Sequence, residues 1–119
     1  MKRDVLDYVV EKTKELVEAP SCSSEAKKAA QAWLAALGTE TEAEETKRFL
    51  EELEADIMPV DGLISFAESE MGAKVFGEEA AKGVAAHGKE IKAAGARYCD
   101  CPACAAAEAI LNKKEEMLQ

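Results

Sequence analysis

The sequence has few aromatic residues, a single histidine and no long hydrophobic run. Its 119 residues include one tryptophan, two tyrosines and three phenylalanines, which is too few for a series of base-stacking platforms. No apolar run approaches the ~20 residues that a membrane-spanning helix needs. The only histidine, His87, cannot complete a di-iron site that requires two. These absences argue against single-stranded nucleic-acid binding, membrane insertion and di-iron chemistry.

Basic residues are also in the minority. The chain has 24 acidic residues against 15 lysines and arginines, a formal net charge of −9. This balance argues against a nucleic-acid backbone or an anionic membrane surface as partner, because both require clustered positive charge. No secretory signal is visible, since Asp4 and Asp7 interrupt the segment that follows Lys2 and Arg3. We therefore expect a cytoplasmic protein, with a protein partner or self-association, in a compartment that keeps thiols reduced.

No segment alternates between apolar and polar residues for long enough to predict a strand. Alanine, glutamate, lysine and leucine dominate, and they are strong helix formers. Apolar residues spaced three and four apart predict a helix over 3–18 and a second that follows the N-cap residue Ser23 and ends at Gly38. A third helix is predicted to end at Pro59 and to open with a capping box, formed by Thr39 with Glu42 or by Thr41 with Glu44. Further helices are predicted over about 60–71, 78–94 and 102–118, with a turn or short helical piece at 72–77. The predicted fold is all-α: a single domain, residues 1–119, forming a compact bundle of five to six helices with short loops.

Several features are predicted to be structural. Trp33 and Phe49 lie on the apolar faces of their helices and are expected in the core. The segment 83–89 resembles a phosphate-binding loop, but Glu90 stands where serine or threonine is required, and no strand precedes it. His87 is expected to be a partly buried or surface residue. No arrangement of nucleophile, base and orienting group can be proposed, so the sequence favours a protein that is not an enzyme.

The four cysteines carry the strongest functional signal. The stretch "RYCDCPAC" places Cys99, Cys101 and Cys104 within six residues, and Cys22 lies 77 residues before Cys99. Cys22, Cys101 and Cys104 fall at predicted helix N-termini, where N–H groups and the helix dipole lower a thiol pKa. If the chain is extended at Cys99, three thiols can converge from one loop. We expect Cys22 to complete a tetrahedral site.

Four thiolates favour structural zinc. An iron–sulfur cluster uses the same ligands and is an alternative cofactor. A second alternative is thiol–disulfide chemistry, with Cys101 as the low-pKa attacking thiol and Cys104 as the resolving one, although the usual βαβ setting of such a motif is missing. In a third alternative, some of the cysteines are simply small buried residues and no cofactor is bound. The predicted function is a metal-binding scaffold or binding module.

Three stretches carry a resemblance that covers nearly the whole chain: "YVVEKTKELVEAPSCSSEAKKAAQAWL", "ADIMPVDGLISFAESE" and "AAGARYCDCPACAAAEAIL". Together they resemble a group of small bacterial proteins, mostly of anaerobes, that are often labelled heat-shock chaperones. The segment around Cys99, Cys101 and Cys104 is the most specific part. The resemblance implies a free-standing protein. An ATP-dependent chaperone of that kind would need a larger α/β nucleotide domain, for which this chain has neither the length nor the strands.

Overall fold

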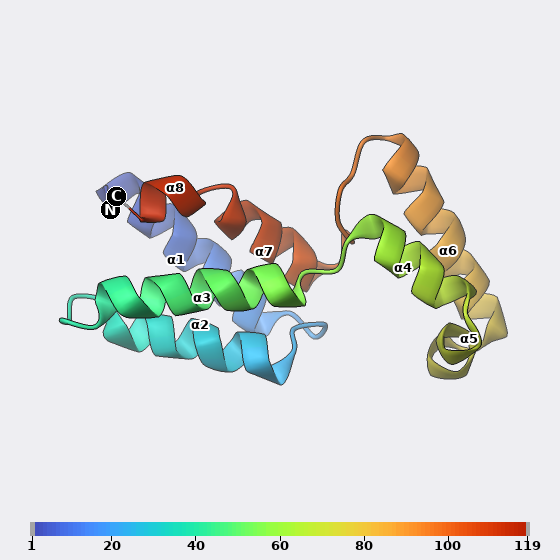
Figure 1. Ribbon diagram of the computed structural model, residues 1–119, viewed down its shortest axis with the longest axis horizontal. Coiled ribbons are helices and arrows are strands. Elements are labelled where there is room, and N and C mark those ends of the chain that lie inside the picture. The colour runs from blue at the N-terminus through green and yellow to red at the C-terminus, as the bar shows by residue number, and fades with distance from the viewer. Residues whose placement is uncertain (1, 119) are drawn as a thin grey trace. The chain divides into compact units, whose positions relative to one another are not determined.

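The computed structural model describes residues 2–118 (Figure 1). This part of the chain contains helices and no strand, which confirms the all-α prediction. Its eight helices exceed the five to six expected from the sequence. They are α1 (Arg3–Glu18), α2 (Ser24–Ala36), α3 (Glu42–Asp56), α4 (Val60–Glu68), α5 (Glu70–Phe76), α6 (Glu78–Ala93), α7 (Pro102–Leu111) and α8 (Lys114–Met117).

Two local features account for the higher count. The Ser69 side chain accepts a hydrogen bond from the Gly72 N–H at 3.1 Å, which starts α5 as a separate helix. The predicted helix over 102–118 is interrupted after Leu111. There the Lys113 N–H donates to the Ile110 carbonyl at 2.9 Å, an i→i+3 bond that tightens the turn between α7 and α8.

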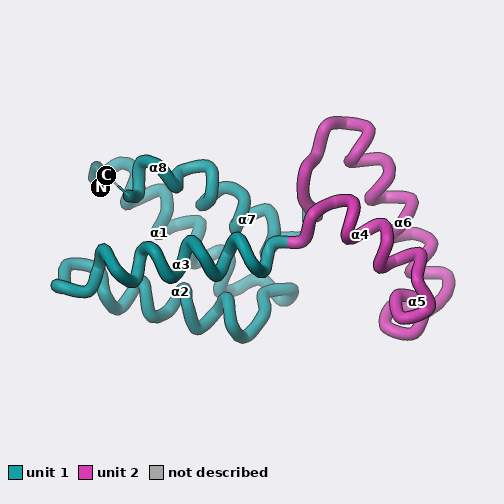
Figure 2. Tube along the Cα trace, in the orientation of Figure 1, with its two compact units in different colours: residues 1–57, 100–119 teal, residues 58–99 magenta. Residues whose placement is uncertain are grey.

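The helices form two compact units (Figure 2). The terminal unit comprises the chain up to Ile57 together with the chain from Asp100 onward, and therefore holds α1, α2, α3, α7 and α8. The central unit comprises residues 58–99 and holds α4, α5 and α6. Single-domain behaviour of the whole chain stays a prediction.

The core of the terminal unit is built where α2 packs on α3 and α1 packs on α7 (Figure 1). Trp33 and Phe49 are both 0% exposed, and their rings stack with centroids 5.4 Å apart. The Trp33 indole N–H donates to the Thr46 hydroxyl at 2.9 Å, so the buried donor is satisfied. The prediction that both aromatic residues belong to the core is confirmed.

The predicted helix caps in the terminal unit are confirmed in part. Ser23 caps α2 by accepting from the Ala26 N–H at 3.1 Å, as predicted. Gly38 follows α2 with a φ of +79°, a conformation that ends the helix. The capping box expected at the start of α3 does not form. Thr41 is the N-cap of α3 but makes no side-chain cap bond, and the Thr39 hydroxyl donates instead to the Ala36 carbonyl at 2.6 Å.

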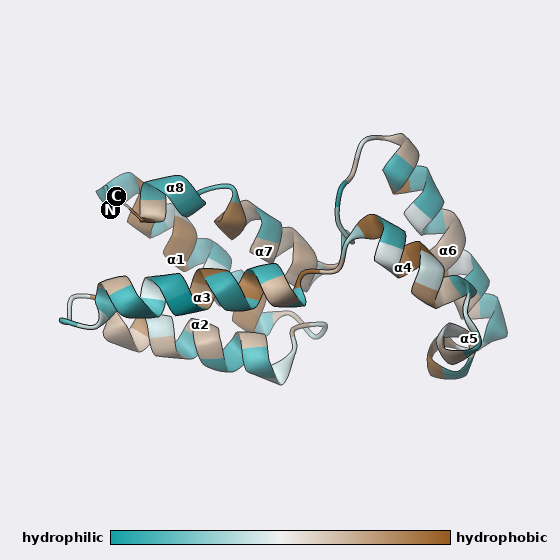
Figure 3. Ribbon diagram, viewed as in Figure 1, coloured by the Kyte–Doolittle hydropathy of each residue, from teal (hydrophilic) through white to brown (hydrophobic). Residues whose placement is uncertain are grey.

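In the central unit, α4 packs against α6 through a short apolar face. The hydrophobic positions of α4 are visible in Figure 3, and its buried residues are Val60, Leu63, Ile64 and Ala67. Two glycines allow close approach. A Cβ at Gly88 would lie 2.8 Å from the Ile64 Cγ1, and one at Gly72 would lie 2.0 Å from the Phe66 carbonyl oxygen.

Candidate metal centre

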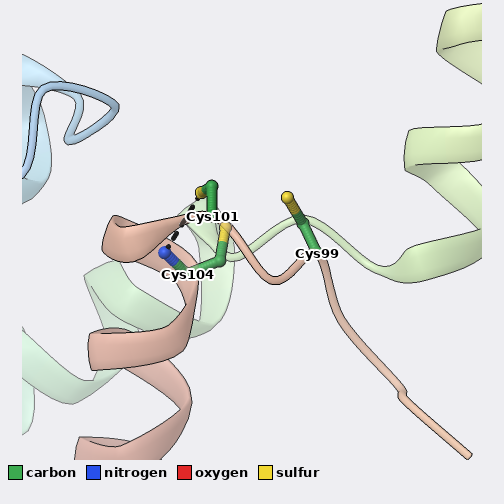
Figure 4. A group of neighbouring side chains, drawn as sticks. All are labelled: Cys99, Cys101 and Cys104. Carbon is green, nitrogen blue, oxygen red and sulfur yellow. Dashed lines mark hydrogen bonds between the residues drawn. The ribbon is translucent and has the colours of Figure 1, made fainter. Parts of the chain in front are cut away.

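Three of the four cysteines meet in one continuous stretch of six residues (Figure 4). The Sγ atoms of Cys99, Cys101 and Cys104 all lie within 4.8 Å of one another, and the three residues are half-buried. Because all three belong to one short segment, the local course of the chain sets their mutual distances. The predicted convergence of these three thiols is confirmed.

The N-terminus of α7 positions two of them. Cys101 is the N-cap, with an extended backbone (φ −62°, ψ 157°), and Pro102 follows at the first helical position, where its missing N–H costs nothing. The Cys104 N–H donates to the Cys101 Sγ at 3.4 Å (Figure 4). A cysteine sulfur thus takes the place of the usual capping oxygen, and one turn of helix brings the Cys104 thiol to the same end.

Cys99 is held by a short antiparallel pairing within the central unit. Its N–H donates to the Met58 carbonyl at 2.8 Å, and the Val60 N–H donates to the Arg97 carbonyl at 2.9 Å. Pro59 and Tyr98 lie opposite each other between these two bonds. The pairing keeps the backbone extended as it reaches Cys99. This pairing could not be predicted from the sequence, because each side is too short for an alternating pattern.

Cys22 is placed elsewhere in the terminal unit. Among the described residues it is not part of the group within 4.8 Å, and its thiol donates to the Ser23 carbonyl at 3.4 Å. However, Cys22 and Cys104 line the same pocket of about 70 Å³. Next to Cys22, the Ser21 hydroxyl accepts from the Ala103 N–H in the first turn of α7, at 3.4 Å. The loop that carries Cys22 therefore lies against the helix that carries Cys104.

The electrostatics of Cys22 differ from the expectation. A lowered pKa was predicted because Cys22 precedes a helix, but burial raises the pKa of its thiol. The nearby Lys27 partly opposes this shift, and Asp56 adds to it. The reason is positional: Ser23, and not Cys22, occupies the N-cap of α2 and takes the hydrogen bond from the helix. The prediction of a lowered pKa was wrong for this cysteine.

His87 is exposed on α6 and does not join the cysteine group. Ser21 and Met58 are contributions to this region that sequence reasoning missed. Ser21 lies 82 positions before Ala103, the residue of α7 that it contacts, and Met58 acts through its backbone carbonyl. Neither residue type marks such a role in a sequence.

No helix in the described part of the chain is both long and apolar enough to cross a membrane. Comparison with known proteins gave no match among family profiles, curated proteins or solved structures.

Proposed function

We propose that this chain is a small metal-binding protein whose centre is built on Cys99, Cys101 and Cys104. The single observation that supports this most strongly is the approach of the three Sγ atoms to within 4.8 Å of one another. Cysteines used only for packing have no reason to converge at a helix start. Thiolates are the ligands that zinc and other soft ions prefer.

Zinc is the proposed ion. A Zn–S distance of ~2.3 Å in a tetrahedron separates the sulfurs by ~3.8 Å. The three sulfurs need to close by no more than about 1 Å to reach that spacing, which rotation about the cysteine χ1 angles can supply. The Cys104 N–H already points at the Cys101 sulfur, and the N-terminal end of α7 stabilises negative charge there.

Cys22 is the proposed fourth ligand. It lines the same pocket as Cys104, and the Ser21–Ala103 hydrogen bond ties its loop to the first turn of α7. Zinc binding would draw the Cys22 thiol away from the Ser23 carbonyl and toward the metal. A structural site of this kind adds its binding energy to folding.

The test is metal analysis of protein purified without oxygen, combined with melting temperatures before and after chelation. One zinc ion per chain is expected, and chelation should lower the melting temperature. Cys22→Ser and Cys101→Ser should each remove the effect of chelation to the same extent if both are ligands. Ser24→Ala is the matched control, because it alters a small exposed residue two positions after Cys22, at the start of α2, and should keep the metal.

Two outcomes would contradict the proposal at different levels. If Cys101→Ser abolishes zinc binding while Cys22→Ser leaves it unchanged, the centre exists but Cys22 is not a ligand. If the protein takes up no metal and Cys101→Ser melts at the wild-type temperature, the metal-binding role is refuted. A brown colour of the purified protein would indicate that the same thiolates hold an iron–sulfur cluster and not zinc.

A second candidate is thiol–disulfide exchange at Cys101 and Cys104. The observation that favours it is the N-cap hydrogen bond at Cys101, because a donor aimed at sulfur stabilises the thiolate that attacks a disulfide. Cys104 would then resolve the mixed disulfide. The rate of Cys101 alkylation against pH, in metal-free protein, tests this function. A reactivity no greater than that of Cys104 would refute it.

The broader role proposed here is a cytoplasmic binding or scaffold module that acts through a protein partner or by self-association. Reduced thiols are consistent with that compartment. Exposed apolar residues on α5 support the partner: Met71 is 58% exposed and Val75, one turn later, is 62% exposed. The net charge of −9 argues against nucleic acid as that partner.

A further inference from the structure

The cysteine group is a set of three, and the fourth cysteine stands apart from it. Cys99, Cys101 and Cys104 lie within 4.8 Å of one another without any contribution from Cys22. Cys22 is directed to the Ser23 carbonyl and belongs to the pocket beside α7. The local chain thus forms a three-thiol site, whereas a four-thiol site requires the Cys22 loop to move.

Whether a site offers three or four thiols determines which ions it suits, because ions differ in coordination number. Zinc in protein sites is almost always four-coordinate, so it needs a fourth ligand besides the three thiolates. Trivalent arsenic is a soft, thiophilic centre that takes three thiolates in a pyramid and leaves its lone pair in the fourth direction. Soft sulfur ligands select soft centres of this type. Arsenic(III) therefore needs three sulfur ligands on one side and no fourth ligand on the other.

We propose that Cys99, Cys101 and Cys104 bind arsenic(III), supplied as arsenite, without Cys22. The inference rests on the proposed metal-binding role of this group, but not on zinc as the ion or on Cys22 as a ligand. The reaction is a condensation: As(OH)₃ and three thiols give As(SR)₃ and three water molecules. Three As–O bonds and three S–H bonds break. Three As–S bonds and the three new O–H bonds of the released water form, and no oxidant or reductant is consumed.

Charge also favours this product. Three thiolates on arsenic(III) form a neutral centre, whereas three or four thiolates on zinc leave a net charge of −1 or −2. The chain already carries −9, and the three cysteines are half-buried, so a neutral centre avoids adding an anion to an acidic protein.

The experiment uses the full-length, reduced, metal-free protein and inorganic arsenite as the probe. Protein with and without arsenite is alkylated with iodoacetamide, and the labelled cysteines are identified by mass spectrometry. Arsenite should protect Cys99, Cys101 and Cys104 and leave Cys22 labelled. Intact mass should increase by one arsenic atom less three hydrogens.

Variants separate the three-thiol site from its alternatives. Cys22→Ser should bind arsenite with an affinity within about twofold of the wild type, whereas Cys99→Ser should lose about tenfold or more, as expected when a ligand is removed. Protection of Cys22, or a large loss of affinity in Cys22→Ser, would overturn the inference. Protection of Cys101 and Cys104 alone would also overturn it, because the site would then be a dithiol.

The outcomes also distinguish this inference from the zinc proposal. Arsenite protection of three cysteines without any zinc uptake supports the three-thiol site and refutes zinc as the ion. Zinc binding that needs all four cysteines, together with arsenite binding that needs Cys22, refutes the inference and leaves the zinc proposal intact.

Discussion

Gly72→Ala is expected to destabilise the central unit strongly, although replacing a helical glycine with alanine usually stabilises the helix. A Cβ at this position would lie 2.0 Å from the Phe66 carbonyl oxygen and 2.9 Å from the Ala67 Cα. Ordinary C···O contacts are about 3.3 Å or longer, so the backbones must separate by more than about 1 Å. Overpacking with backbone shifts costs about 1–3 kcal/mol or more. Because the obstructing atoms are backbone, we expect the upper end, and a net loss of at least about 2 kcal/mol after the helix-propensity gain.

Gly83→Ala is the matched control. Gly83 is exposed in the middle of α6, and a Cβ there would meet nothing within 4 Å. Alanine should therefore add only its helix propensity, which is about 0.5–1 kcal/mol. Neither glycine has a positive φ, so backbone strain does not affect the comparison. At about 4 °C per kcal/mol for a chain of this size, Gly72→Ala should melt about 8 °C below the wild type and Gly83→Ala about 3 °C above it.

Two probes make the assay informative. Circular dichroism at 222 nm follows all helices, whereas fluorescence of Trp33, the only tryptophan, follows the terminal unit. Equal shifts by both probes would show that the chain unfolds as one domain; a shift confined to circular dichroism would show that the central unit unfolds separately. The packing argument is refuted if Gly72→Ala is as stable as Gly83→Ala by circular dichroism.

Three further predictions concern the terminal unit. Trp33→Ala should cost about 3–5 kcal/mol in urea denaturation, because it empties a fully buried site; a loss below about 1 kcal/mol would contradict its place in the core. Ser23→Ala should cost about 1 kcal/mol by removing the α2 cap, whereas Thr41→Ala, which removes no cap bond, should cost a few tenths; equal losses would contradict the cap assignment. Burial, with a contribution from Glu25, raises the pKa of Asp56, although a hydrogen bond from Ser23 opposes the shift. The raised pKa means that the folded state disfavours the charged carboxylate, so Asp56→Asn should raise the melting temperature at pH 7. Near pH 3 the carboxyl is protonated in both the folded and the unfolded state, so the variant should lose this advantage. An equal rise in melting temperature at both pH values would contradict the assignment.

The fold could be predicted from the sequence where local signals and burial agree. The Trp33 and Phe49 positions follow from helical spacing, and Gly38 ends α2 as glycine commonly does. The prediction was wrong where two local signals competed. The Thr39 hydroxyl can cap a helix or return to a preceding carbonyl, and it bonds the Ala36 carbonyl, so the expected capping box is lost. The close approach at Gly72 could not be predicted, because no sequence pattern indicates that Gly72 contacts the Phe66 backbone.

In the candidate site, too, the features set by local contacts could be predicted from the sequence, and the feature set by a distant contact could not. Cys99, Cys101 and Cys104 converge because an extended segment leads directly into a helix start, and both features were readable from "CDCPAC". Cys22 depends on how a loop 77 residues away from Cys99 meets α7, and that contact is made by Ser21 and Ala103, two residues with no chemical signature. Counting four cysteines therefore predicts a four-ligand centre, while the local geometry brings only three thiols together. Whether an ion recruits the fourth depends on the coordination number that the ion demands, which is why zinc and arsenite give opposite expectations for Cys22→Ser.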